Sequence, residues 1–282
     1  MRTATTKAEV RAAVAEARRA GKRIALVPTM GYLHEGHLSL LDRARAGADW
    51  VAMSIFVNPL QFGPTEDLSR YPRDLERDLR LAGGRGTDLV FTPPVEEMYS
   101  AGEQKVFVLP DASLEDHLDG ASRPGHFRGV LTVVAKLFGI FAPDLAVFGQ
   151  KDLQQALLIR RMVADLDMPL EIDVAPIVRE SDGLAMSSRN VYLSAEERAR
   201  ALALSRAVEA CRARFAAGET DGDALRAVVR SALDVPGVEV DYAEVVDPAT
   251  LDAVKVAAPG SVCAVAARMG RTRLIDNAIL GA

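Results

Sequence analysis

An alternation of apolar runs and amphipathic segments along the first two-thirds of the chain most constrains its fold. Runs typical of buried strands lie at 23–28, 51–57, 89–91, 145–148 and 172–178. Segments whose apolar residues recur at helical spacing lie at about 6–20, 36–47, 75–82, 130–141 and 152–165. Strands that are separated by helices pair in parallel, with helices on both faces of the sheet. The sequence therefore predicts a doubly wound α/β domain.

The pattern changes after about residue 180. Ser194 and Glu197 form a capping box for a long helix, which Gly218 ends. A shorter helix over 222–233 and strand-like runs at 238–246, 261–267 and 271–275 follow. We therefore expect a Rossmann-like domain over residues 1–179 and a smaller α+β domain over 180–282. Because no Pro/Ser-rich linker joins them, we expect the two domains to pack closely. We also expect the smaller domain to close over the site.

Composition excludes several classes of protein. The 282 residues carry 34 basic and 39 acidic side chains, a net charge of −5, so no nucleic-acid partner is expected. The two cysteines, Cys211 and Cys263, have no metal-like spacing, which disfavours a zinc site or a disulfide scaffold. The first residues lack the apolar core of a secretory signal, and no apolar run reaches the roughly 18 residues of a membrane span. We expect a cytoplasmic protein without a membrane anchor.

Polar, glycine-assisted segments follow four of the predicted strands. They lie at 28–37, 58–63, 149–152 and 186–190. In an open parallel sheet, ligands bind beyond the carboxyl ends of the strands. We therefore expect the four segments to form one site.

The segment after the first strand contains His34 and His37. Their spacing of three, at the start of a helix, is not the spacing of four that a zinc protease motif needs. A helix N-terminus beside two imidazoles suits anionic oxygens instead. The alternative is one exposed loop histidine and one core histidine. We favour the anion site because half of the chain's four histidines lie here.

Two further segments have residues suited to phosphate. The turn over 149–152 combines a glycine with Lys151, but it is not a Walker A loop, and a solvated lysine is the common alternative. Ser187, Ser188 and Arg189 supply hydroxyls and a guanidinium on a turn, for which the alternative is an ordinary polar loop.

Neutral amides complete the set. Gln61 and Gln155 are expected to face the site, whereas Gln154 is expected on the surface of its helix. The stretch over 123–129 is expected to be either structural capping or a flexible gate for the site.

Together these motifs resemble those of the pantothenate synthetase (pantoate–β-alanine ligase) family of HxGH nucleotidyltransferases. The resemblance runs from about residue 5 to the end of the chain, in the order of the family's motifs. Tyr32 stands where the family more often has a small or polar residue, and Gln150 stands where glutamate is common. Asp119 lies where an acidic residue is expected. The blocks that carry the resemblance are Pro28–His37, Phe56–Phe62, Tyr71–Arg73, Arg123–Val130, Phe148–Gln155 and Met186–Asn190.

The resemblance implies a two-step reaction. ATP adenylates the carboxylate of pantoate, and the amine of β-alanine then displaces AMP. The resemblance also implies Mg²⁺ and a homodimer. It implies Gln61, Gln155, Asn58 and Arg123 for substrate, with Gln61 also near β-alanine. The ATP-binding residues that it implies are Met30, Gly31, Tyr32, Leu33, His34, Glu35, Gly36, His37, Gly149, Gln150, Lys151, Asp152, Val178, Met186, Ser187, Ser188 and Arg189.

Adenylation gathers negative charge on the α-phosphate and on the departing pyrophosphate, so catalysis is mostly charge stabilisation. His37 is also a candidate proton donor. Asp152 is expected either to position Mg²⁺ or to be a carboxylate favoured by the helix dipole, and no all-protein metal site is expected. The residues expected to stabilise charge are His34, His37, Lys151, Ser187, Ser188 and Arg189.

Three other functions compete with this interpretation. A cytidylyltransferase or phosphopantetheine adenylyltransferase shares the HxGH motif but lacks the blocks around Gln61 and Gln155. A non-catalytic nucleotide sensor is disfavoured because the imidazole pair and the Lys/Ser/Arg set are both present. A fragment of a class I tRNA ligase is disfavoured by the acidic balance.

Overall fold

The computed structural model describes residues 1–64, 66–99 and 104–281. The chain forms two compact units, and neither is a single continuous stretch. The first unit comprises Met1–Asp111, Arg123–Gln150 and Leu158–Pro176. The second unit comprises Ala112–Ser122, Lys151–Leu157 and Ile177–Ala282.

The first unit is built on a six-stranded sheet in the order β1-β4-β3-β2-β5-β6, with every pair parallel. The doubly wound fold expected from the sequence is confirmed. Strand β1 was not expected, because Arg2-Thr3-Ala4 is not an apolar run. The strands are β1 Arg2–Ala4, β2 Ile24–Thr29, β3 Trp50–Ile55, β4 Leu89–Phe91, β5 Leu145–Gly149 and β6 Glu171–Ala175.

Helices and 3₁₀ turns connect these strands. Strand β6 stops earlier than the apolar run at 172–178 indicates, because Pro176 has no N–H for the ladder. No helix within the described residues is long and apolar enough to cross a membrane. The connecting elements are α1 Lys7–Arg19, α2 Glu35–Gly47, η1 Pro59–Gln61, α3 Leu75–Gly84, α4 Val95–Met98, α5 Ala112–Glu115, α6 Leu118–Ser122, α7 His126–Phe141, η3 Gln150–Asp152 and α8 Leu153–Asp165.

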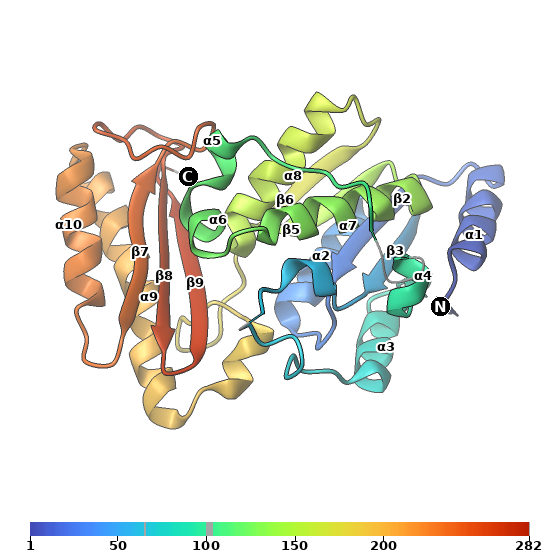
Figure 1. Ribbon diagram of the computed structural model, residues 1–282, viewed down its shortest axis with the longest axis horizontal. Coiled ribbons are helices and arrows are strands. Elements are labelled where there is room, and N and C mark those ends of the chain that lie inside the picture. The colour runs from blue at the N-terminus through green and yellow to red at the C-terminus, as the bar shows by residue number, and fades with distance from the viewer. Residues whose placement is uncertain (65, 100–103, 282) are drawn as a thin grey trace. The chain divides into compact units, whose positions relative to one another are not determined.

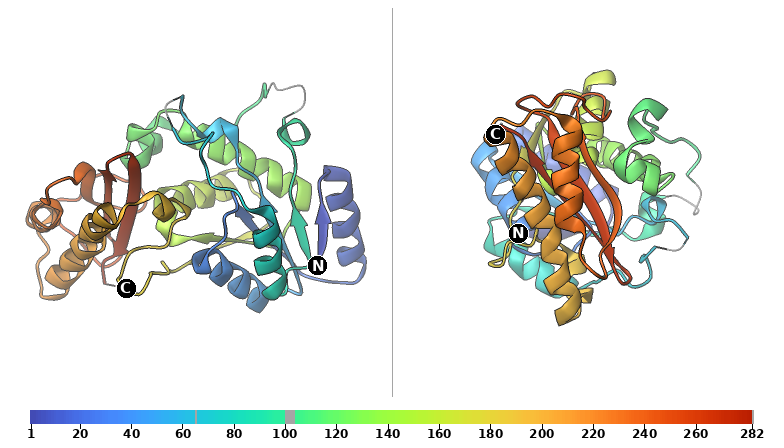
Figure 2. Two further views of the ribbon diagram at one scale, coloured as in Figure 1. Left: turned by 90° about the horizontal axis from the view of Figure 1, so that it is seen from below. Right: turned by 90° about the vertical axis from the view of Figure 1, so that its left-hand side faces the viewer.

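The strands of the first unit lie between helices (Figures 1 and 2). One face of the sheet packs against Leu38, Leu41 and Ala44, which lie three residues apart on α2. On the other face Phe138 of α7 packs against Phe148 of β5, with ring centroids 6.5 Å apart. Because both faces are covered, the central strands are apolar at successive positions, and this is the pattern that the sequence shows.

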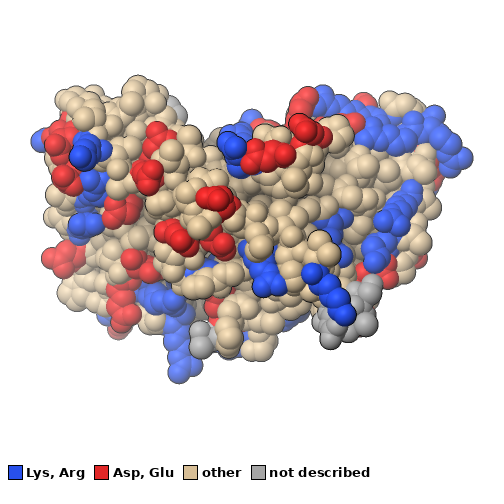
Figure 3. Space-filling model, turned by 45° about the horizontal axis from the view of Figure 1, so that its top comes forward, with Lys and Arg blue, Asp and Glu red and all other residues tan. Residues whose placement is uncertain are grey.

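Much of the surface charge is paired. The face shown in Figure 3 carries both basic and acidic side chains. At the amino ends of β2 and β5, Arg18 pairs with Asp144 at 2.7 Å, and Asp144 also accepts the N–H of Ile24 at 2.7 Å. Exposed pairs contribute about 0–1 kcal/mol each, so the stability of the fold depends chiefly on its cores.

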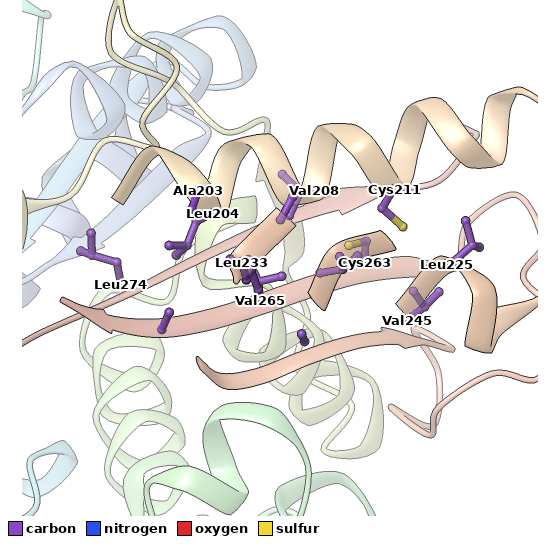
Figure 4. Close-up of a cluster of buried hydrophobic side chains, with 14 of the residues drawn as sticks. Ala203, Leu204, Val208, Cys211, Leu225, Leu233, Val245, Cys263, Val265 and Leu274 are labelled. Atoms are coloured by element: carbon purple, nitrogen blue, oxygen red, sulfur yellow. The ribbon is translucent and has the colours of Figure 1, made fainter. Parts of the chain in front are cut away.

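The second unit contains an antiparallel sheet in the order β7-β8-β9. The predicted α+β architecture is confirmed. Helices α9 and α10 cover one face of the sheet, and their apolar side chains point toward the strands (Figure 4). The two cysteines lie in this core as buried free thiols. The elements are η4 Ser188–Tyr192, α9 Ala195–Ala216, α10 Gly222–Leu233, β7 Glu239–Val246, β8 Val262–Met269 and β9 Thr272–Ile279.

Candidate active site

The loop that joins β2 to α2 turns sharply at Gly31 and Tyr32, whose φ angles are +85° and +52°. A Cβ atom on Gly31 would lie 2.9 Å from Asp78 Oδ2 and 2.9 Å from Ile55 Cγ2. Only glycine fits this position, because it combines a left-handed backbone with a closely packed surrounding. The backbone of the loop is therefore held in one course toward the start of α2.

Asp78 of α3 fixes this loop through hydrogen bonds to its backbone. Its carboxylate accepts the backbone N–H groups of Tyr32 and Leu33, each at 2.7 Å, and the residue is only 1% exposed. Burial raises the pKa of Asp78, while the two N–H donors act against that shift. Arg77 adds a bond from Nη1 to the Leu33 carbonyl at 2.8 Å. Asp78 was not expected from the sequence, although it lies on the same helix face as Ala82, which the periodicity had placed inside.

His34 and His37 lie together at the N-terminus of α2. The backbone N–H of His34 donates to Nδ1 of His37 at 3.3 Å, and the ring centroids are 4.1 Å apart. Because Nδ1 of His37 accepts a hydrogen bond here, the neutral ring carries its own proton on Nε2. The helix dipole and the backbone N–H groups of this turn both favour an anionic ligand.

The pair Asn58 and Gln61 lies at the turn η1 that follows β3. Asn58 Nδ2 donates to Gln61 Oε1 at 3.0 Å, and both residues are buried. Gln61 Nε2 lies 3.2 Å from the sulfur of Met30, which precedes Gly31. Within the first unit, the structure thus brings together two of the segments that the sequence selected.

Arg123, expected to bind substrate, already has a protein partner. Its guanidinium donates to both carboxylate oxygens of Glu66, at 2.6 and 2.9 Å, and its Nη1 lies 2.9 Å from His126 Nε2. Burial alone raises the pKa of Glu66, but hydrogen bonding and charge from Arg123 outweigh it and lower the pKa. The contacts favour the structural interpretation of the stretch over 123–129, and a substrate role for Arg123 stays a prediction.

Lys151 is the first residue of the second unit after β5. Its side chain is 21% exposed, with Nζ 3.6 Å from Asp152 Oδ1. Asn277 of β9, which the sequence did not single out, donates from Nδ2 to the Lys151 carbonyl at 3.1 Å. The backbone of Lys151 is thus fixed to a strand of the second unit.

The serine-rich turn at 187–189 belongs to the same unit and follows a short hairpin. The N–H of Met186 donates to the Val178 carbonyl at 3.0 Å, and Ser187 accepts the N–H of Arg189 at 3.2 Å. The hairpin is tied to β9, because Arg179 forms two bonds to the buried carboxylate of Asp276, at 2.6 and 3.0 Å.

A second set of charges supports the end of this turn. Asn190 donates to Glu180 Oε1 at 2.7 Å, and Arg198 of α9 donates to Glu180 and to Asp182, at 2.7 Å each. The side chains of these three ion-paired residues are 29–34% exposed. The turn that carries the candidate phosphate ligands is therefore supported by paired charges.

Helix α8 begins with two glutamines, Gln154 and Gln155, and the prediction made for Gln154 was wrong. Gln154 was expected on the surface but is only 3% exposed. Its Oε1 accepts the N–H of Asp119 at 2.9 Å, and its Nε2 donates to the carbonyls of Leu114 and His117 at 3.0 Å. Gln154 is thus a buried structural residue, and helical periodicity missed it because the covering segment is distant in sequence. Gln155 is half-buried.

The other expected ATP-binding residues lie at the ends of their elements. Glu35 is exposed and pairs with Arg85 at 2.6 Å, while Gly149 ends β5 and Gln150 begins η3. Within the described residues, no three His, Cys, Asp or Glu side chains cluster in a way that holds a metal ion.

A doubly wound sheet with an imidazole pair in the loop between β2 and α2, and with buried amides after β3, has the arrangement expected of the HxGH class. A family model described as pantoate–β-alanine ligase matches residues 2–279. The chain belongs to this family.

Known relatives match this chain over almost its whole length. The pantothenate synthetase of Pelotomaculum thermopropionicum is 55% identical over 282 residues, which is all of this chain and 99% of the relative. The crystal structure of pantothenate synthetase from Thermus thermophilus superposes with a TM-score of 0.94 at 48% identity, covering 99% of both chains. A pantoate–β-alanine ligase from Francisella tularensis, complexed with β-γ ATP and β-alanine, has a TM-score of 0.81 at 30% identity, covering 99% of this chain and 97% of its own.

Membership of this family makes the chain a ligase that forms pantothenate from pantoate and β-alanine. The family assignment expected from the motifs is confirmed.

Proposed function

We propose that the chain forms pantothenate in two steps with ATP as the activating substrate. A carboxylate oxygen of pantoate attacks the α-phosphorus of ATP, the bond to the bridging oxygen breaks, and pyrophosphate leaves with the electron pair. The amine of β-alanine then attacks the acyl carbon of pantoyl adenylate. The acyl carbon–oxygen bond breaks, AMP leaves, and the amine loses its proton. Activation is needed because the oxygen of a free carboxylate is a very poor leaving group.

The observation that carries this proposal is the geometry of His34 and His37. The backbone bond to His37 Nδ1 places the proton of the neutral ring on Nε2, at a helix N-terminus. Charge develops on phosphate oxygens during adenylation, and a fixed donor there stabilises the transition state more than the ground state. A relative supports the ligand assignment, because the Francisella tularensis enzyme was solved in complex with β-γ ATP and β-alanine.

In the second unit, Lys151 and Arg189 are the proposed cationic partners of the triphosphate, and the hydroxyls of Ser187 and Ser188 are added donors. Lys151 is a point charge suited to phosphate, and its backbone is held by Asn277. Arg189 follows a serine cap that fixes the course of the turn. Neither group needs to form a covalent bond, since phosphoryl transfer mostly requires positioning and charge stabilisation.

Pantoate is the proposed ligand of Gln61 and Gln155, with Asn58 supporting Gln61. A neutral amide recognises hydroxyl and carboxylate oxygens without adding charge to the site. The structure supports this for Gln61, which is held by Asn58 and lies beside Met30.

Magnesium is proposed to enter with the triphosphate as part of the substrate. Mg²⁺ usually keeps several waters and is bound through phosphates and one or two carboxylates. A homodimer and a cytoplasmic location stay predictions from the sequence.

The test is a product assay in which ATP, pantoate and β-alanine are omitted in turn. We expect AMP and pantothenate in equal amounts only when all three are present. Formation of ADP in place of AMP, or of AMP without pantoate, would show that the proposed chemistry is wrong.

A further inference from the structure

Tyr99, which follows α4, has a buried hydroxyl that the reaction described above does not use. The residue is 3% exposed, and its Oη lies 2.6 Å from Asn58 Oδ1. Its ring is enclosed, with the Phe56 ring centroid 6.0 Å away and Lys136 Nζ 5.4 Å from its own centroid. The hydroxyl therefore has a fixed position beside the amide that holds Gln61.

The backbone around Asn58 determines which way its amide points. Oδ1 accepts the N–H of Leu60 at 3.3 Å, and Nδ2 donates to the carbonyl of Gly129 at 3.1 Å. A backbone N–H can only donate and a carbonyl can only accept, so the two ends of the amide cannot be exchanged. Tyr99 must then donate to Oδ1, and its bond is the shorter of the two at that oxygen.

The orientation of the Asn58 amide also determines the orientation of the Gln61 amide. Because Asn58 Nδ2 is a donor, Gln61 Oε1 is the acceptor of the bond at 3.0 Å. Gln61 Nε2 then faces the sulfur of Met30 at 3.2 Å, and a thioether is a weak acceptor. Gln61 thus keeps an N–H group that can donate to a ligand, while its oxygen already accepts a hydrogen bond from Asn58.

Ionisation does not disturb this arrangement. Burial raises the pKa of Tyr99 above its usual range, so the hydroxyl keeps its proton and stays a donor. The three hydrogen-bonded residues, Tyr99, Asn58 and Gln61, therefore keep the same donor and acceptor roles across the pH range in which enzymes work.

We propose that Tyr99 is a positioning residue that locks the Gln61 amide, through Asn58, as a hydrogen-bond donor to an oxygen of pantoate. The proposal rests on the proposed role of Gln61 in binding pantoate.

The test is the variant Tyr99→Phe, which removes one oxygen and keeps the ring. We expect kcat/KM for pantoate to fall about tenfold, mostly through KM, because Asn58 Oδ1 loses the shorter of its two hydrogen bonds and Asn58 then holds Gln61 less firmly. KM for ATP should change less than about twofold. The matched control is Tyr242→Phe in the second unit, which removes a buried hydroxyl bonded to Asp119 and should leave both KM values unchanged.

A double-mutant cycle separates positioning from a general loss of stability. In a Gln61→Ala background, Tyr99→Phe should have no further effect on kcat/KM for pantoate, because nothing is left to orient. If Tyr99→Phe lowers kcat/KM equally in both backgrounds, or raises KM for ATP as much as KM for pantoate, the positioning role is wrong.

A measurement without substrate keeps this proposal separate from the proposed function. The side-chain NH₂ signals of Gln61 can be followed by ¹⁵N NMR in the intact protein. We expect them to shift and broaden in Tyr99→Phe but not in Tyr242→Phe, and unchanged signals would overturn the proposal. If the wild type forms ADP in place of AMP, the proposed function fails, and this spectrum still decides whether Tyr99 orients Gln61.

Discussion

In the first unit, the loop between β2 and α2 is held by a buried carboxylate that accepts backbone N–H groups, whereas in the second unit the serine-rich turn is held by arginine–carboxylate pairs. Asp78 bonds directly to Tyr32 and Leu33 in the first case. In the second, Arg179 and Arg198 bond to carboxylates that flank the turn.

The difference predicts how much stability is lost when the supporting side chain of each loop is removed. Removing Asp78 leaves buried N–H groups without an acceptor, and each costs about 1–3 kcal/mol. Removing a partly exposed pair such as Arg198 with Glu180 costs far less and depends on salt, because water and ions screen it. The comparison therefore predicts unequal responses to substitutions that are similar in kind.

The largest effects are expected at the proposed ligands of the triphosphate. His37→Ala and Lys151→Ala should each lower the rate of pantoate-dependent ATP–pyrophosphate exchange by about 10²–10³, since each removes a donor to developing charge. The melting temperature should stay near that of the wild type. Lys255→Ala, an exposed lysine of the second unit, is the control. Near-normal exchange in either variant would remove that residue from the proposed chemistry.

The next largest effect tests the buried carboxylate. Asp78→Ala should lower the free energy of unfolding by about 2–4 kcal/mol, because two buried N–H groups lose their acceptor. Exchange should also slow as the loop before His34 loosens. Asp74→Ala removes the exposed cap of the same helix, so about 1 kcal/mol and normal exchange are expected. Equal losses from urea unfolding of the two variants would contradict the special role of Asp78.

The pair of Glu66 and Arg123 is an ion pair in the first unit, so it sharpens the comparison. The folded-state pKa of Glu66 is lowered, so its stabilising contribution is present above the unfolded pKa of about 4.3 and is lost as pH falls through the folded value. Glu66→Gln should cost about 1–3 kcal/mol at pH 7.

The measurement is urea unfolding of Glu66→Gln and the wild type from pH 7 to pH 3. Their difference should hold to about pH 5 and shrink below about pH 4. Glu76→Gln, at a side chain that is 89% exposed, should show no such trend. A difference that stays constant to pH 3 would show that charge on Glu66 is not the cause.

The smallest effect is expected at the paired charges of the second unit. Arg198→Ala should lower the free energy of unfolding by about 1 kcal/mol or less, and 1 M salt should reduce this further. KM for ATP should change less than twofold. The control is Arg212→Ala, which removes an exposed pair with Glu209 on the same helix. A loss above about 3 kcal/mol would mean that Arg198 supports the serine-rich turn as strongly as Asp78 supports its loop, which would contradict the comparison.

Local patterns were sufficient for most of the fold. The helix over 222–233 was placed at its observed bounds, and the capping boxes at Thr6 and Ser194 begin the helices that they indicated. Strand β1 was missed because Arg2-Thr3-Ala4 is not an apolar run, and the short helices α5 and α6 were missed because four or five residues show no helical period.

The supporting residues of the site could not be found in this way. Asp78, Tyr99 and Asn277 contact residues that lie 45, 41 and 126 positions away, so no window of the sequence contains both partners. One signal was present, since Asp78 shares a helix face with Ala82. By contrast His34, His37 and Lys151 could be selected, because glycine-assisted turns after apolar runs mark the carboxyl ends of parallel strands.

The central claim is that pantoate is activated as an adenylate before β-alanine takes part. It is tested most directly by the exchange of labelled pyrophosphate into ATP, measured with pantoate present and β-alanine absent. We expect exchange that depends on pantoate and that proceeds without β-alanine. Exchange that requires β-alanine, or that proceeds without pantoate, would contradict an adenylate formed in a separate first step.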